Sequence, residues 1–161
     1  MSEDIMAFGM GESAIGELMR EKIARMENPS LATYARPSEV RLRATAKAEN
    51  AEAAEALLAP VVRETVAYLG DIVYGVDVPN LETACMAALK KKGWPFATAE
   101  RCTGGRVAER TPALPRASAV YRGGVVSSWP PAKADALGID SDLPQAHGPV
   151  SRPCARSLAE H

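Results

Sequence analysis

The sequence lacks the features that mark three classes of protein. It has no excess of positive charge, because 19 lysines and arginines stand against 20 aspartates and glutamates, whereas a domain that neutralises phosphates is usually strongly basic. It has no run approaching the roughly 20 apolar residues of a membrane-spanning helix. Its amino terminus, Met-Ser-Glu-Asp, lacks the basic start and apolar run of a signal peptide. We therefore expect no nucleic-acid partner, no membrane association and a cytoplasmic location.

Cysteine is also scarce, and the spacing of the cysteines matches neither a disulfide framework nor a metal site. The three cysteines, Cys85, Cys102 and Cys154, form no Cys-x-x-Cys pair and have no histidine at a metal-ligand spacing. An odd number without such spacing indicates neither a set of disulfides nor a zinc site. We expect reduced thiols and no bound metal.

The sequence does contain enough apolar residues for a core. Of its 161 residues, 47% are hydrophobic and 24% are charged, which suits one ordinary domain or two small ones. The apolar spacing predicts a helix over residues 12–25 with Ser13 as its N-cap. Two strands are predicted at 31–35 and 40–46, the second alternating apolar and polar residues as a half-buried antiparallel strand does.

The next predicted element is an alanine-rich helix over residues 51–69. Pro60 is expected to kink or restart this helix, and Gly70 to end it. A short strand at 71–75 and a linker at 76–79 complete the first half. We interpret the arginines of the predicted hairpin, Arg36, Arg41 and Arg43, as the solvated face of a strand, because residues 1–75 lack a Gly-x-x-Gly clamp between helices.

The second half alternates helices and strands, which is typical of an α/β layout. Asn80 is predicted to cap a helix that ends in Lys90, Lys91, Lys92 and Gly93. The further predicted elements are a strand at 94–99, a helix that opens at Gly104-Gly105, a strand at 119–126 and a helix at 132–137.

The stretch that carries chemical information lies where the strand at 94–99 leads into the glycine pair. A chain that leaves a strand through small and hydroxyl residues and enters a helix at two glycines directs free backbone N–H groups outward. Such a place binds anions and stabilises oxyanions. We therefore expect the functional site here.

Three motifs in the second half resemble the C-terminal domain of the CinA family, the competence and damage-inducible proteins. They are Thr-Ala-Glu-Arg-Cys-Thr-Gly-Gly at 98–105, Gly-Gly-Val-Val-Ser at 123–127, and Lys133 after them. In that family this domain is a nicotinamide mononucleotide amidohydrolase, which converts the carboxamide of its substrate to a carboxylate and ammonia. The resemblance implies that nicotinamide mononucleotide is the ligand and that no cofactor takes part.

The first half resembles the KH-like module that precedes this domain in the family. Gly-Glu-Ser at 11–13 and Tyr-Gly at 74–75 carry the resemblance, together with the order of predicted elements. The implied fold class is α/β, with a small α+β KH-like module at 1–76 followed by an incomplete three-layer α/β/α amidohydrolase domain at 77–161.

The resemblance also assigns the catalytic positions, and two of the three are changed. The family's serine nucleophile falls on Arg101, its tyrosine falls on Ser128, and its lysine falls on Lys133. Arginine cannot attack a carbonyl carbon, because its guanidinium stays protonated and has no usable lone pair. The sequence therefore predicts a catalytically impaired domain.

Substrate contacts are expected from Cys102, Thr103, Gly104 and Gly105, whose backbone could hold a phosphate. Cys102 and Thr103 are the two replacement nucleophiles that the sequence offers. We favour neither. The side chain of Cys102 is expected to point in a different direction from that of residue 101, and the hydroxyl of Thr103 needs a base positioned beside it. His147 has no cysteine or carboxylate cluster beside it, which favours a surface position over a ligand or base.

The family's His-Gly-Ala-Val-Ser, which leads into a helix, corresponds to His-Gly-Pro-Val-Ser at 147–151. Further strands follow in the family, so we expect a truncated domain whose unpaired strand edges favour self-association. Two functions remain open. The chain is a truncated, impaired amidohydrolase, or it is a non-catalytic interaction or scaffold module centred on the KH-like half.

Overall fold

The computed structural model describes residues 1–111, 116–127 and 142–160 of the chain. The chain divides into two compact units, Met1–Ala84 and Cys85–His161, which are described separately. Within the described ranges, no helix combines the length and the hydropathy needed to cross a membrane.

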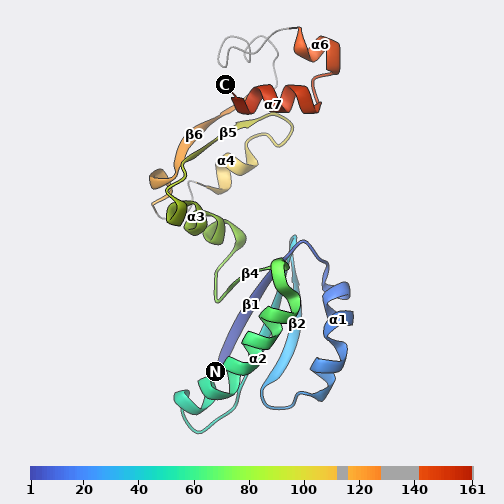
Figure 1. Cartoon of the computed structure of the whole chain (residues 1–161), viewed down its shortest axis with the longest axis vertical. Coiled ribbons are helices and arrows are strands. Elements are labelled where there is room, and N and C mark those ends of the chain that lie inside the picture. Colours follow the sequence, from blue (N-terminus) through green and yellow to red (C-terminus); the bar gives the residue numbers. More distant parts are fainter. Residues whose placement is uncertain (112–115, 128–141, 161) are drawn as a thin grey trace. The chain divides into compact units, whose positions relative to one another are not determined.

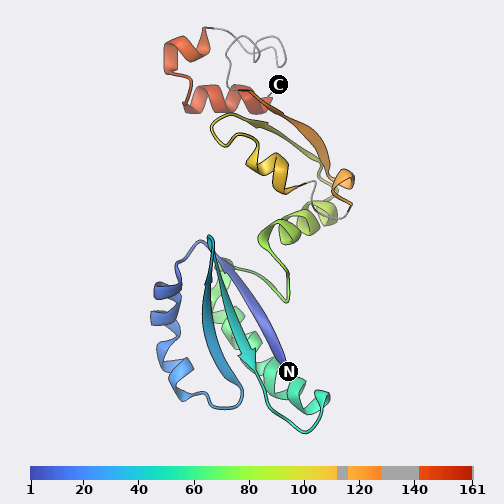
Figure 2. The same cartoon turned by 180° about the vertical axis from the view of Figure 1, so that it is seen from behind.

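The first unit is a four-stranded antiparallel sheet with two helices (Figure 1). Its elements are β1 (Ser2–Phe8), α1 (Glu12–Arg25), β2 (Ser30–Arg36), β3 (Glu39–Thr45), α2 (Ala51–Leu69) and β4 (Val73–Val76). The strand order is β2-β3-β1-β4 with every neighbouring pair antiparallel, the arrangement of ferredoxin-like split β-α-β folds. Seen from the opposite side, the strands lie in front of α2 (Figure 2).

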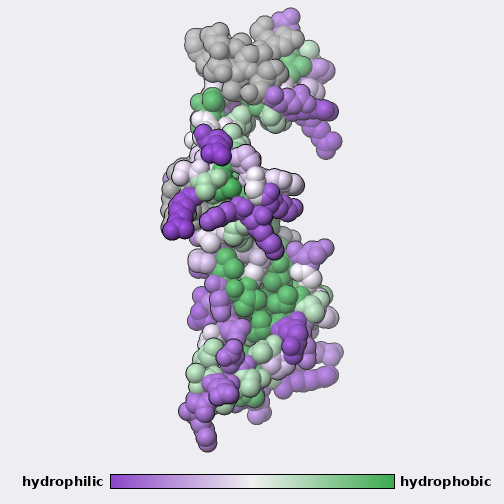
Figure 3. Space-filling model, turned by 60° about the vertical axis from the view of Figure 1, so that its left-hand side comes forward, coloured by the Kyte–Doolittle hydropathy of each residue, from purple (hydrophilic) through white to green (hydrophobic). Residues whose placement is uncertain are grey.

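The core of this unit lies between the sheet and the two helices. The predicted alternation in β3 is confirmed, because Val40, Leu42 and Ala44 are all buried while the residues between them are not. The buried residues of the two helices that pack against this face are Ile15, Met19, Ala54, Leu58, Val62 and Leu69. Part of the unit's surface is also apolar, with hydrophilic residues around it (Figure 3).

The sequence predictions for α1 and the hairpin are confirmed. The first strand, β1, was not predicted. The strand β1 pairs with β3 on one side and β4 on the other, so it is a central strand. Its residues Ile5, Met6 and Ala7 are all buried, and a short continuous apolar run gives no periodic signal. The prediction of Ser13 as a cap is wrong, because Gly11 occupies the N-cap position of α1 without a side-chain hydrogen bond.

The helix α2 begins and ends where the sequence predicts. It runs through Pro60 as one helix, so of the kink or restart expected there, the restart is wrong. Asn50 caps its first turn by accepting a hydrogen bond from the N–H of Ala53 at 2.8 Å. Gly70 ends it with a φ of 59°, a conformation in which glycine carries no steric penalty.

The face of the sheet that α1 and α2 leave open is organised around Asp4. Its carboxylate accepts two hydrogen bonds from Arg43, at 2.7 and 2.8 Å, and lies 3.6 Å from Arg41. The hydrogen bond from Arg43 is the main reason that the pKa of Asp4 is lowered. Arg41 also lies over the ring of Tyr34. Two of the three arginines expected on this face therefore interact with one carboxylate. This supports the interpretation that they stabilise the strand face and do not form a nucleic-acid-binding patch.

The residues expected to form a linker are attached to the first unit. The N–H of Asp77 donates to the carbonyl of Asp4 at 2.8 Å, and the N–H of Asp4 donates to the Asp77 carboxylate at 2.7 Å. Further along, Arg36 donates to the carbonyl of Pro79 at 3.4 Å. These bonds hold the segment after β4 against the sheet.

The second unit contains a parallel pair of strands, as the α/β prediction requires. The elements of this part of the chain are α3 (Leu81–Lys92), β5 (Phe96–Glu100), α4 (Arg106–Arg110), β6 (Tyr121–Val126), α6 (Leu143–His147) and α7 (Arg152–Glu160). Asn80 caps α3 as predicted, accepting from the N–H of Thr83 at 2.8 Å. The helix predicted at 132–137 lies outside the described residues.

Few apolar side chains are buried in the described part of the second unit. Among its described residues, the buried apolar side chains are those of Ala117, Val120 and Cys154. Parallel sheets normally have both faces covered, and two strands alone are marginal. We therefore expect the first unit to supply most of the chain's conformational stability.

One core position predicts a gain in stability. The side chain of Thr65 on α2 is fully buried, and its hydroxyl has no hydrogen-bond partner among the described residues. Because valine has the same shape without the polar group, Thr65→Val should raise the free energy of unfolding by about 1 kcal/mol. Urea unfolding followed by circular dichroism measures the change. Thr65→Ala, which leaves a cavity, should lower stability; an equal loss in both variants would show that the hydroxyl is satisfied.

Candidate functional site

The loop between β5 and α4 has a backbone that requires its two glycines. Gly104 and Gly105 have φ values of 65° and 94°, and Gly105 is the N-cap of α4. A Cβ at Gly105 would also lie 2.9 Å from a methyl carbon of Val126 on β6. The glycine pair therefore lets the chain turn tightly against the neighbouring strand, as the sequence motif suggests.

The carboxylate of Glu100, at the end of β5, fixes this loop. It accepts hydrogen bonds from the hydroxyl of Thr103 at 2.6 Å and from the N–H groups of Val107 at 3.0 Å and Ala108 at 2.7 Å. The Thr103 hydroxyl bond is the main reason that the pKa of Glu100 is lowered, and the two backbone bonds act in the same direction. The Glu100 carboxylate thus compensates the partial positive charge of the free N–H groups in the first turn of α4.

The sequence argument overlooked Glu100. The available signal was an acidic residue three positions before a threonine and close to a predicted helix start, which is where a carboxylate stabilises free N–H groups. The Thr103 hydroxyl is engaged by Glu100, which argues against its use as a nucleophile. The N–H of Gly104 donates within the loop, to the carbonyl of Arg101 at 3.2 Å.

The side chain of Arg101 is half-buried and lines a pocket of about 480 Å³ in the second unit. Its Nη1 atom is buried and has no hydrogen-bond partner among the described residues. The lining residues are Ala99, Arg101, Cys102, Pro149, Val150, Ser151, Arg152, Ala155 and Leu158. The described lining of the pocket therefore comes from the end of β5 and the loop after it, and from α7 and the segment that leads into it.

The other predicted site residues divide into two groups. Cys102, Thr103 and Gly104 are exposed on the same loop as Arg101, and Cys102 lines the pocket. Ser128 and Lys133 lie outside the described residues. The structure thus brings together the residues of the first motif, and the assignment of roles to positions 128 and 133 stays a prediction.

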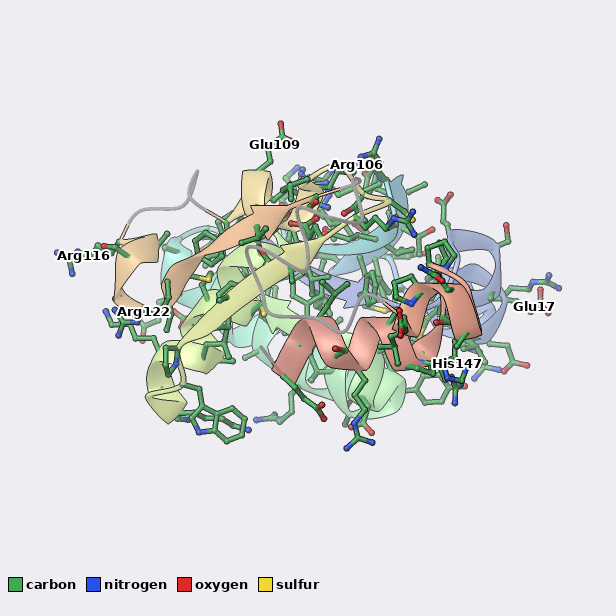
Figure 4. The ribbon with its side chains drawn as sticks, turned by 90° about the horizontal axis from the view of Figure 1, so that it is seen from above. Glu17, Arg106, Glu109, Arg116, Arg122 and His147 are labelled. Carbon is green, nitrogen blue, oxygen red and sulfur yellow. The ribbon has the colours of Figure 1, made fainter. Side chains whose placement is uncertain are left out.

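The segment before α7 confirms the helix expected after 147–151. The hydroxyl of Ser151 donates to the carbonyl of Gly148 at 2.9 Å and accepts from the N–H of Cys154 at 3.4 Å. The buried Cys154 thiol donates to the same carbonyl at 3.2 Å. His147 ends α6 and is exposed, with its side chain directed away from the ribbon (Figure 4). This is the surface position that the sequence favoured.

The second glycine motif holds the two strands together. The hydroxyls of Thr98 on β5 and Tyr121 on β6 are hydrogen-bonded at 3.0 Å. A Cβ at Gly124 would collide with both hydroxyl oxygens. The ring of Tyr121 also packs on Phe96, with 5.1 Å between ring centroids. Gly124 therefore has a packing role in the strand pair.

Two family models match the chain. The model described as the damage-inducible protein CinA KH domain matches residues 2–75, and that of the CinA C-terminal domain matches residues 79–161. A putative competence-damage inducible protein of Geobacillus kaustophilus is 42% identical over 154 residues, 96% of this chain and 37% of the relative. A CinA-like protein of Gloeobacter violaceus is 42% identical over 159 residues, 99% of this chain and 37% of the relative.

The chain thus spans less than two fifths of the length of these relatives. Among solved structures, the competence damage-inducible protein A of Klebsiella pneumoniae is similar over 50% of each chain, with 32% identity and a TM-score of 0.48.

The role of Glu100 predicts a pH dependence. Because the folded-state pKa of Glu100 is lowered, its contribution to stability is fully present above its ordinary pKa of 4.5 and is lost as the pH falls through the folded value. The hydrogen-exchange protection factors of the Val107 and Ala108 amides, which compare the observed rate with the intrinsic rate at the same pH, should therefore fall on acidification. In Glu100→Gln, exchange at these two amides should be faster at neutral pH. Unchanged protection would show that α4 does not depend on this carboxylate.

Proposed function

The chain belongs to the CinA family, and on this premise we propose that residues 77–161 form a nicotinamide mononucleotide amidohydrolase domain that binds its ligand without hydrolysing it. The observation that supports this is the identity of position 101. Where the resemblance assigns the nucleophile, the chain has an arginine that lines a pocket. We place the boundary between the KH-like module and this domain after Val76.

Hydrolysis of a carboxamide is an acyl transfer. A nucleophile attacks the carbonyl carbon, a tetrahedral oxyanion forms, and ammonia leaves after protonation. The Arg101 guanidinium has five N–H donors but no atom that can attack. Lys133 could act as a base only if burial or a nearby cation lowers its pKa, and a base alone has nothing to activate.

The loss of two cooperating groups explains why we expect binding without turnover. Removing one member of a catalytic set typically lowers the rate by ~10³ or more. Here both the serine and the tyrosine positions are changed, to Arg101 and Ser128. The described walls of the pocket come from β5 with the loop after it and from α7 with the segment before it, so we expect a ligand to bind without the two family hydroxyls.

Cys102 is the remaining nucleophile to consider. It is exposed and lines the same pocket, so a ligand could reach it. A thiol needs a base or a lowered pKa to attack, and no described residue forms a hydrogen bond with the Cys102 thiol. We therefore propose no nucleophilic role for it. The three unpaired thiols fit the reducing cytoplasm, where we place the protein.

A second candidate function is an interaction or scaffold module centred on the first unit. What favours it is a groove of about 1040 Å³ beside α1 and α2. Leu18 and Tyr68, which line this groove, are 48% and 62% exposed, large values for such side chains. Apolar surface of this kind often marks a contact with another protein. In this case the KH-like module would be the working part, and the chain would self-associate or bind a partner there.

The proposal predicts no release of ammonia. The chain incubated with nicotinamide mononucleotide should produce no ammonia above the uncatalysed background, because the serine and tyrosine of the family's catalytic set are replaced by Arg101 and Ser128. A coupled assay that detects ammonia measures this. Turnover at rates usual for enzymes would refute the loss of hydrolysis.

Restoring the family's residues supplies the matched comparison. Arg101→Ser combined with Ser128→Tyr should release more ammonia than either single variant, because the two groups are assigned to one cooperating set. If the single variant Ser128→Tyr alone gave the full gain, position 101 would not be the site of attack.

A further inference from the structure

We infer that the pocket beside Arg101 is a binding site for a small phosphate monoester, whose anionic group is held by Arg101 and Arg152. The inference deepens the proposed function and rests on it, because it takes this pocket to be the ligand site and identifies the residues that recognise the ligand. It places the phosphate away from the glycine pair, where the sequence motif alone would put it.

The first observation is the buried nitrogen of Arg101. The Nη1 atom lies out of contact with solvent and donates to no described residue. A guanidinium stays charged at any physiological pH, and a buried charged donor without an acceptor costs free energy. Such a group in a folded protein calls for an acceptor. Because Arg101 lines the pocket, an anion there would offset the charge of its guanidinium.

The second observation is the charge of the pocket's lining. Among the described residues that line it, the charged ones are Arg101 and Arg152, both positive, and none is an aspartate or glutamate. Two guanidinium groups facing one space repel each other unless an anion lies between them. Arginine also matches phosphate well, because its planar group can donate two parallel hydrogen bonds.

The pocket's remaining walls suit the uncharged part of such a ligand. They are formed mainly by the apolar residues Ala99, Pro149, Val150, Ala155 and Leu158. The volume of about 480 Å³ lies within the range typical of small-molecule sites. The Ser151 hydroxyl is engaged at the start of α7, so specificity for the anion falls on the two arginines.

The neighbouring start of α4 does not compete for this anion. Its N–H groups at Val107 and Ala108 already donate to the Glu100 carboxylate. A phosphate placed there would meet a negative charge. The pocket at Arg101 is therefore the better site for an anion on this loop.

Isothermal titration calorimetry on the whole chain tests the inference with three probes. These are nicotinamide mononucleotide, inorganic phosphate, and nicotinamide riboside, which lacks the phosphate. We expect the mononucleotide to bind more tightly than the riboside, and inorganic phosphate to compete with it. Arg101→Gln and Arg152→Gln should each weaken mononucleotide binding about tenfold or more, the usual effect of losing a charged hydrogen bond.

Arg122→Gln is the matched control. Arg122 is exposed on β6, and its side chain points away from the ribbon (Figure 4). This variant should bind the mononucleotide as the unchanged chain does. Arg152 is exposed, so Arg152→Gln should fold even if Arg101→Gln does not, and circular dichroism checks both.

Three results would overturn the inference. They are equal affinity for the mononucleotide and the riboside, unchanged affinity in Arg101→Gln and Arg152→Gln, or no heat with either phosphate-bearing probe at millimolar concentration. Ammonia release is measured separately. Turnover would refute the proposed loss of hydrolysis without bearing on the proposed phosphate site. Binding that does not depend on Arg101 and Arg152 would refute the phosphate site without bearing on the loss of hydrolysis.

Discussion

The site of this protein depends on one carboxylate, that of Glu100. It stands at the end of β5 and accepts three hydrogen bonds from residues that follow it, including two backbone N–H groups of α4. Because these bonds close the loop on itself, they fix the five residues between the strand and the helix. The same bonds use up the helix N-terminus that a phosphate would otherwise find. We therefore expect side chains of the loop to recognise a ligand; of these, Arg101 and Cys102 line the pocket, and Arg101 carries the charge.

The two units differ in the apolar core that their described residues form. The first has a continuous apolar core between a four-stranded sheet and two helices. The second has a parallel pair of strands, and Ala117, Val120 and Cys154 are the buried apolar residues in its described part. In the described part of the second unit, polar contacts fix the local structure, namely the Glu100 bonds, the Thr98–Tyr121 hydrogen bond and the Ser151 cap. Single substitutions can remove each of these contacts.

Sequence reasoning was most successful where one periodic signal determines an element. The helices α1 and α2 and the hairpin were predicted because their apolar residues repeat with a clear period. The strand β1 was missed because Ile5, Met6 and Ala7 are all buried. The glycine motif located the loop, yet sequence could not show that Glu100 occupies the helix start, because a carboxylate's partners depend on the folded backbone. Nor could it show that Arg152, 51 positions after Arg101, lines the same pocket.

The central claim is that position 101 has changed from a place of attack to a place of anion binding. Nuclear magnetic resonance of the chain labelled with ¹⁵N-arginine tests it directly, with the Arg101 side-chain signal assigned from its absence in Arg101→Gln. The account predicts that this signal shifts on titration with nicotinamide mononucleotide while the substrate's amide stays intact in the same tube. An unmoved Arg101 signal, or the appearance of nicotinate mononucleotide, would contradict it.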